Sequence, residues 1–265
     1  MKHGIATFLA TGVLVVSTLP AVAQTTPPVP LPGTPYVKFA ESLADLGGYQ
    51  PIPNPNLEFS IPSGGALFGQ CVDISMPFDF VFYGDRTRTV SACAHGVVGM
   101  DPGDRFTSTN WAPGGSDRFA DDFDGFIAPF WGRVFLAGFT SSSFGWTVGG
   151  AFPQRYLALE YTNLTDAQSS FQTPAWELDV QLRLYEGPSG RIEIDFDLED
   201  VASGSGTNPS ATSGMESQQG DQTIAFIEPN QNPNHVWQDV ARELDGRRLT
   251  FVQDPGVELR SEERR

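Results

Sequence analysis

Three aspartates stand close together at residues 121, 122 and 124, with a glycine directly after them. Carboxylate oxygens are the ligands that Ca²⁺ prefers, and a glycine permits the sharp turn of a calcium loop. An EF-hand would also need Asp or Asn at position 120 and Glu at position 131, which are Ala120 and Trp131 here. We therefore exclude an EF-hand. A metal-free acidic loop is the main interpretation, and the alternative is a looser Ca²⁺ site at Asp121, Asp122 and Asp124.

These aspartates belong to a polar, glycine-rich segment, residues 101–126, that lacks the alternation of a strand but holds several aromatic residues. Long segments without internal structure in a compact domain are often functional. Exposed aromatic side chains are frequent anchors in binding interfaces. The segment therefore predicts ligand binding through Phe106, Trp111 and Phe119.

No residue pattern in the chain predicts catalysis. The chain has no Gly-x-Ser-x-Gly motif, so His95 has no nucleophile to activate. His95-Gly96 is better explained as a tight turn, because histidine, like asparagine, tolerates a positive φ. A glycosidase needs two carboxylates facing each other, and 32 acidic residues provide such pairs by chance. We predict no catalytic residues, and a polysaccharide-active hydrolase is an alternative.

One predicted hairpin carries many carboxylates on its outward positions. Two alternating strands flank residues 186–190, with Glu177, Asp179, Gln181 and Arg183 facing outward on the first and Glu193, Asp195, Asp197 and Glu199 on the second. We interpret this row as a solvated face that keeps the protein soluble. A cation-binding or ligand-steering face is the alternative.

The elements that must position these residues are strands. Apolar residues alternate with polar ones within residues 78–82, 157–161, 178–184 and 192–198, as they do in strands with one buried face. No alternation of strands and helices appears, so we predict an all-β antiparallel sandwich, similar to a jelly roll. Two short peripheral helices are expected, one across Phe39, Leu43 and Leu46 and one over residues 236–244.

The N-terminus has the features of a secretory signal peptide. A short charged start precedes an apolar stretch, and Ala21-Val22-Ala23 provides small residues before a cleavage site. We expect a signal peptide at 1–23, a proline-rich leader at 24–35, one β domain at 36–252 and a polar tail at 253–265. The mature protein is expected to be secreted, extracellular or at the cell surface, with the periplasm as an alternative. We expect no membrane insertion after cleavage.

Two cysteines, Cys71 and Cys93, are the only ones in the chain. An isolated pair in an exported protein is most simply one disulfide, and two buried free thiols are the alternative. On the chain-entropy model, a bridge across a loop of this length stabilises the fold by about 3 kcal/mol.

Several phrases occur in an order that resembles the nidogen-type extracellular domain and its bacterial relatives. The resemblance covers about residues 57–252, and its phrases are PFDFVFYG (77–84), TVSACAHGVVGM (89–100), IAPFWGRVF (127–135), RYLALEYTNL (155–164), VQLRLYEGPSGRIEIDFD (180–197) and QTIAFIEP (222–229). Among the departures from the family pattern are His95 in place of the usual asparagine and the cysteine pair. The resemblance implies a β module of extracellular adhesion or matrix proteins, without catalytic residues to transfer.

Together these observations predict a non-enzymatic adhesion or matrix-type binding module. Its expected partner is an extracellular protein or a glycan. The net charge of −16 argues against nucleic acid, because a phosphate backbone requires a basic surface. We expect no cofactor. The alternatives are the hydrolase and a Ca²⁺-stabilised surface protein.

Overall fold

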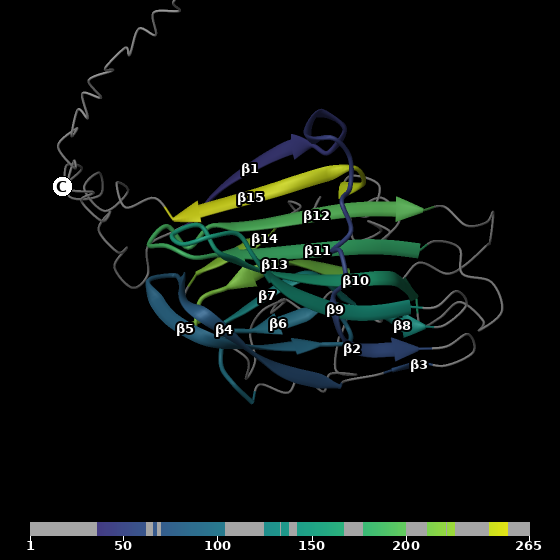
Figure 1. Cartoon of the computed structure of the whole chain (residues 1–265), viewed down its shortest axis with the longest axis horizontal. Coiled ribbons are helices and arrows are strands. Elements are labelled where there is room, and N and C mark those ends of the chain that lie inside the picture. The colour runs from purple at the N-terminus through teal and green to yellow at the C-terminus, as the bar shows by residue number, and fades with distance from the viewer. Residues whose placement is uncertain are drawn as a thin grey trace, which may run out of the picture.

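The computed structural model describes residues 36–61, 66–67, 70–103, 125–132, 134–137, 142–166, 177–199, 211–220, 222–225 and 244–253. Within these ranges the chain forms two antiparallel sheets packed against each other, which confirms the predicted all-β sandwich (Figure 1). The predicted signal peptide and leader, and all of the predicted tail beyond residue 253, lie outside the described residues. No helix of the described part has the length and apolar character needed to cross a membrane.

The larger sheet has nine strands. Its order is β1–β15–β12–β11–β10–β8–β3, and β9 also pairs with β10 and carries β2 at its other edge. The strands are β1 (Tyr36–Ser42), β15 (Arg247–Gln253), β12 (Ile192–Glu199), β11 (Glu177–Tyr185), β10 (Tyr156–Asp166), β8 (Val134–Ala137), β3 (Ala66–Leu67), β9 (Ser142–Gly149) and β2 (Asn56–Ile61).

The smaller sheet has six strands in the order β14–β13–β7–β6–β5–β4. They are β14 (Thr223–Ala225), β13 (Ala211–Glu216), β7 (Phe126–Gly132), β6 (Val97–Gly99), β5 (Asp85–Cys93) and β4 (Cys71–Phe82). The predicted disulfide is confirmed, because Cys71 and Cys93 are opposite each other in the β4–β5 register and are bonded. The bridge ties the first residue of β4 to the last residue of β5.

The core fills the space between the two sheets with the apolar residues of the alternating segments. One cluster joins Phe78, Phe80 and Phe82 of β4 to the inward residues of β10, β11 and β12. These three phenylalanines are almost fully buried, as are Leu178, Val180, Leu182 and Leu184 of β11. The period-two pattern therefore identifies correctly which side of each strand faces the core.

The hairpin predicted around residues 186–190 is confirmed as the turn between β11 and β12. Leu184 pairs with Ile192, and the amide of Tyr185 donates to the carbonyl of Arg191 at 3.0 Å. Gly187 and Gly190 both have positive φ. An added Cβ at Gly190 would lie 2.2 Å from the carbonyl oxygen of Val81, so the turn requires glycine there.

The helix predicted across Phe39, Leu43 and Leu46 is wrong. Phe39 lies in β1, which pairs with β15 along all seven of its residues, and only a 3-10 turn at Ala44–Leu46 follows. Of the three apolar residues only Leu43 is buried, while Phe39 is 53% exposed. The helical spacing arose by chance, and pairing with β15 determined the local structure. The second predicted helix, residues 236–244, lies outside the described residues except for Leu244.

Residues 43–55, which we call the strap, cross the outer face of the larger sheet. Figure 1 shows this segment descending from the end of β1 over β12, β11 and β10 to β2. Leu43 and Ile52 are its buried residues, and the amide of Leu43 donates to the carbonyl of Gly246 at 2.7 Å. The strap thus covers part of a face that the sequence pattern assigned to solvent.

Candidate functional site

The outward row of the β11–β12 hairpin differs from the predicted solvated face. Glu177, Glu193 and Asp195 are buried, with at most 7% of their surface exposed, whereas Asp197 is exposed. The interpretation as a solvated face is therefore wrong for these three carboxylates. Burying a carboxylate is unfavourable unless hydrogen bonds or opposite charges compensate for the lost water.

Arginines compensate Asp195 and Glu193. Arg248 on β15 donates from Nε and Nη2 to both carboxylate oxygens of Asp195, at 2.6 and 2.8 Å, and Arg183 on β11 donates to Asp195 at 2.7 Å. Both arginines also lie within 3.7 Å of the Glu193 carboxylate. The hydrogen bond with Asp195 raises the pKa of Arg248 above its usual value. The forked contact holds the guanidinium in one orientation.

Two tyrosines and a third arginine extend this cluster toward the hairpin turn. Tyr185 donates its hydroxyl to Glu193 at 2.7 Å, and its ring lies 5.4 Å from the ring of Tyr156 on β10. The guanidinium of Arg191 stacks 4.8 Å above the Tyr185 ring and also donates to Glu193. Burial raises the pKa of Tyr185, so its hydroxyl is protonated and remains a donor at neutral pH.

We call this group the arginine–tyrosine surface; its members are Tyr156, Arg183, Tyr185, Arg191, Glu193, Asp195 and Arg248. Apart from Arg191 in the β11–β12 turn, its members lie on β10, β11 and β12, which are paired on both sides, and on the neighbouring β15. Arg191 remains 48% exposed despite its contacts. The surface therefore presents planar side chains with fixed orientations, as binding interfaces do.

A second arginine–aromatic contact lies directly before β10. Arg155 at the start of β10 lies 5.6 Å from the ring of the buried Phe78 and 5.8 Å from that of Phe152, which is 78% exposed. Both carboxylate oxygens of Glu186 accept hydrogen bonds from Arg155. The neighbouring loop thus places an exposed apolar side chain next to Arg155.

Beneath the strap, the buried carboxylate of Glu160 is held by neutral donors. It accepts a hydrogen bond from the Tyr49 hydroxyl at 3.0 Å, from the Ile52 amide at 3.2 Å and from Gln181 Nε2 at 2.9 Å. Gln181 also donates to the carbonyl of Gln50. Two of the three donors to Glu160 belong to the strap, so this carboxylate fastens the strap to the sheet.

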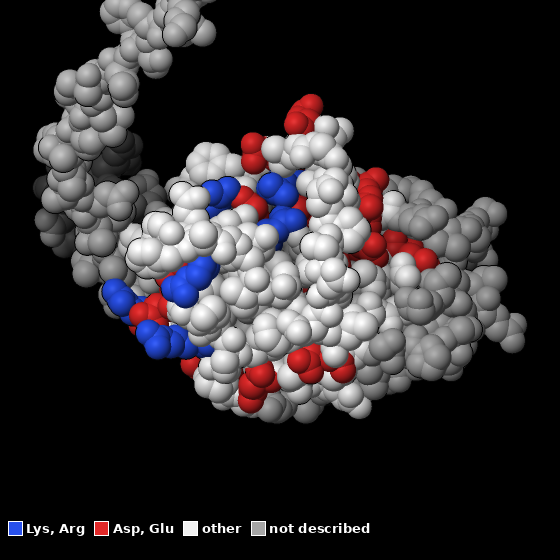
Figure 2. Space-filling model, viewed as in Figure 1, with Lys and Arg blue, Asp and Glu red and all other residues white. Residues whose placement is uncertain are grey.

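Asp179 lies beyond the strap and is compensated less well. Its carboxylate accepts a hydrogen bond from the Asn163 amide at 2.7 Å. Burial, together with the negative charges of Glu160, Asp197 and Glu177, raises the pKa of Asp179 to about 6. Figure 2 shows the same division, with arginine and lysine gathered on one side of the strap and only acidic residues on the other.

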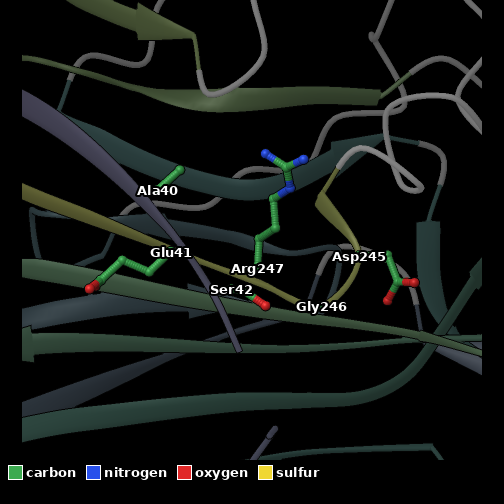
Figure 3. Close-up of a pocket in the computed structure, with 6 residues that line it drawn as sticks. All are labelled: Ala40, Glu41, Ser42, Asp245, Gly246 and Arg247. Atoms are coloured by element: carbon green, nitrogen blue, oxygen red, sulfur yellow. The ribbon is translucent and has the colours of Figure 1, made fainter. Parts of the chain in front are cut away.

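A shallow cavity of about 340 Å³ lies where β1 ends and β15 begins, lined by Ala40, Glu41, Ser42, Asp245, Gly246 and Arg247. Figure 3 shows the charged side chains of Glu41, Asp245 and Arg247 pointing in different directions. Because they do not converge on one point, they form no set that could hold a substrate or transfer a proton.

The binding and metal residues predicted from the sequence lie outside the described residues. This applies to Phe106, Trp111 and Phe119 and to Asp121, Asp122 and Asp124, all within residues 104–124. In the part of the chain that the structure describes, no group of three or more histidine, cysteine or acidic side chains could hold a metal ion. The aromatic-loop and calcium interpretations stay predictions.

His95 lies in the predicted turn, which is confirmed by a hydrogen bond from the Gly96 amide to the Cys93 carbonyl at 3.1 Å. The positive φ, however, belongs to Gly96 and not to His95. A Cβ at Gly96 would lie 2.5 Å from the Phe130 carbonyl oxygen, so only glycine fits. The His95 imidazole is buried, and burial lowers its pKa to about 4, which keeps it neutral at neutral pH.

Sequence reasoning missed the arginine–tyrosine surface although it identified the outward positions correctly. One signal was available, because Tyr185 and Arg191 continue the outward alternation of Arg183 and Glu193 toward the turn. The hydrogen bonds between Arg248 and Asp195 could not be predicted from the sequence, since 53 residues separate the two.

Comparison with known proteins gives one match. A model of the family described as NIDO related matches residues 63–251, which is most of the chain and includes all strands from β3 to β14. The comparisons with curated proteins and with solved structures found no match.

Proposed function

Because this chain belongs to the NIDO-related family, we propose that it is an extracellular, non-enzymatic module that binds a protein or a glycan. The resemblance to nidogen-type domains and the Cys71–Cys93 disulfide both support an extracellular location, since disulfides persist in oxidising compartments. We propose in addition that the module serves in adhesion or in an extracellular matrix.

The arginine–tyrosine surface carries the proposal. Tyrosine and arginine are enriched at the centres of binding interfaces, because they offer large contact areas together with hydrogen-bonding groups. Here their orientations are fixed before any partner arrives, by the Arg248–Asp195 fork and by the Arg191–Tyr185 stack. Groups that are ordered in advance lose less conformational entropy on binding.

The same contacts favour binding over acid–base catalysis. A general acid or base needs a carboxyl group that is free to meet a substrate. On this surface Glu193 and Asp195 are each engaged by more than one arginine. These two carboxylates are suited to orienting arginines.

The test is to immobilise extracellular glycans and matrix-type proteins and to measure capture of the full secreted chain and of two variants. Arg191→Ala removes a half-exposed member of the surface, and Trp111→Ala removes an anchor of the sequence-predicted loop. We expect Arg191→Ala to reduce capture at least about tenfold. Loss in Trp111→Ala alone would place binding in the loop and contradict the proposed surface. Release of sugar from a polysaccharide would contradict a non-enzymatic role.

A further inference from the structure

The charges within the arginine–tyrosine surface do not balance. Three guanidinium groups, those of Arg183, Arg191 and Arg248, surround two carboxylates, those of Glu193 and Asp195. Glu41 lies opposite Arg248 in the β1–β15 register, but the two form no ion pair in the described structure. Within this group one guanidinium charge is therefore in excess, and a carboxylate of a ligand would complement it.

Arg191 is the group best placed to meet that carboxylate. Its side chain is 48% exposed, compared with 12% for Arg183 and 20% for Arg248. Stacking on Tyr185 and the contact with Glu193 orient its guanidinium while leaving part of it open to solvent. A guanidinium oriented in this way can donate two parallel hydrogen bonds to one carboxylate.

The tyrosines beside Arg191 form an apolar area in which the two ring planes are inclined by 48°. The rings of Tyr156 and Tyr185 lie 5.4 Å apart, and both side chains are half-buried. The Tyr156 ring passes over Gly149 of β9, where an added Cβ would lie 2.4 Å from the ring. A pyranose ring has an apolar face of C–H groups that packs well on such rings, while its hydroxyls bond to nearby arginine and carboxylate groups.

We propose that the arginine–tyrosine surface binds a glycan that contains carboxylated sugars, with a sugar carboxylate at Arg191 and an adjacent ring on Tyr156 and Tyr185. This inference rests on the proposed binding function and names the ligand class of the same surface. The position of the surface argues against an extended peptide, because β10, β11 and β12 are all paired on both sides and offer no free edge for strand addition.

The experiment uses uronate trisaccharides (galacturonate, glucuronate, mannuronate and guluronate) together with the methyl esters of each. An ester keeps the sugar ring but removes the negative charge. Short oligosaccharides are chosen because the net charge of −16 opposes them less than it opposes a long polyanion. Titration calorimetry with the full secreted chain is expected to show at least one acid binding about tenfold more tightly than its ester.

Arg191→Gln is expected to reduce binding of the acid to the level of the ester. The matched control is Arg88→Gln on β5, since Arg88 is also exposed and paired with a carboxylate, that of Asp79, but lies in the smaller sheet. This control should bind like the native chain. Tyr156→Ala is expected to weaken acid and ester alike, because the ring contact does not depend on charge.

Three results would overturn the inference. The first is that no acid binds more tightly than its ester, and the second is that Arg191→Gln binds the acid normally. The third is that a hexaglutamate peptide binds at Arg191 more tightly than every uronate; in that case the surface binds ligands as proposed, but its ligand is a peptide. Hydrolysis of any trisaccharide would instead contradict the non-enzymatic function itself.

Discussion

The outer face of the larger sheet carries buried carboxylates on both sides of the strap, and the two sides compensate them differently. On one side, Glu193 and Asp195 are surrounded by three arginines. Under and beyond the strap, Glu160 and Asp179 accept hydrogen bonds only from neutral groups in the described structure. These carboxylates all occupy outward positions on neighbouring strands. They differ because β15 brings an arginine to Asp195 and Glu193, whereas the strap brings only neutral donors to Glu160.

This difference assigns separate roles to the two sides. The arginine–tyrosine surface has one more arginine than carboxylate, which suits it to an external ligand. Glu160, which is held by neutral donors, fastens the strap to the sheet. The three variants below test the distinction, from the largest expected effect to the smallest.

Removal of Asp195 should have the largest effect on stability. Asp195→Ala leaves the largely buried Arg183 and Arg248 without their shared carboxylate, and we expect the free energy of unfolding to fall by about 3 kcal/mol. Urea denaturation measures this change. Asp79→Ala, which disrupts the exposed ion pairs with Arg86 and Arg88, should lower the same quantity by less than about 1 kcal/mol. Equal losses in the two variants would show that burial of the network is unimportant.

Removal of Glu160 should release the strap. Glu160→Ala deletes the acceptor of the Tyr49 hydroxyl and the Ile52 amide, and we expect a loss of about 2 kcal/mol in the free energy of unfolding. Hydrogen exchange should show faster exchange at the Ile52 amide, while the amides that pair β11 with β12 remain protected. Unchanged protection at Ile52 would mean that Leu43 and Ile52 hold the strap through their apolar contacts alone.

Neutralisation of Asp179 should give the smallest effect, and one that depends on pH. The pKa of Asp179 is raised from 3.8 to about 6 in the folded protein, so the native state binds more protons than the unfolded state between about pH 4 and pH 6. The contribution of Asp179 to the free energy of unfolding therefore falls as pH rises through that window. Above the window, the folded protein bears the full cost of holding the ionised carboxylate.

Asp179→Asn keeps an acceptor for the Asn163 amide but removes the charge. The full pKa shift corresponds to about 3 kcal/mol, and because Asp179 is only partly buried, solvent screening reduces the gain that we expect in the free energy of unfolding to about 1 kcal/mol at pH 7, with no difference at pH 4. Thermal unfolding at several pH values measures this. Asp45→Asn in the exposed 3-10 turn is the control and should show no pH-dependent gain. A gain at pH 4 equal to that at pH 7 would contradict a raised pKa.

The sequence was most informative where structure depends on residues close together in the chain. The alternation in β4, β10, β11 and β12 predicted which side chains reach the core, and the glycines near residue 188 predicted the hairpin. It was misleading at Phe39, Leu43 and Leu46, where a helical spacing lies in a strand and a turn. It also gave no indication of the strap, because Ile52 and Glu160 are 108 residues apart.

By itself, the sequence determined the all-β class, the inward and outward sides of the main strands and the disulfide pair. These follow from the period of apolar residues along a strand and from the presence of only two cysteines. The tertiary structure alone decided which outward carboxylates are buried and which of them meet an arginine. The reason is that burial and charge compensation depend on β15 and the strap, which reach the hairpin through space from distant parts of the chain.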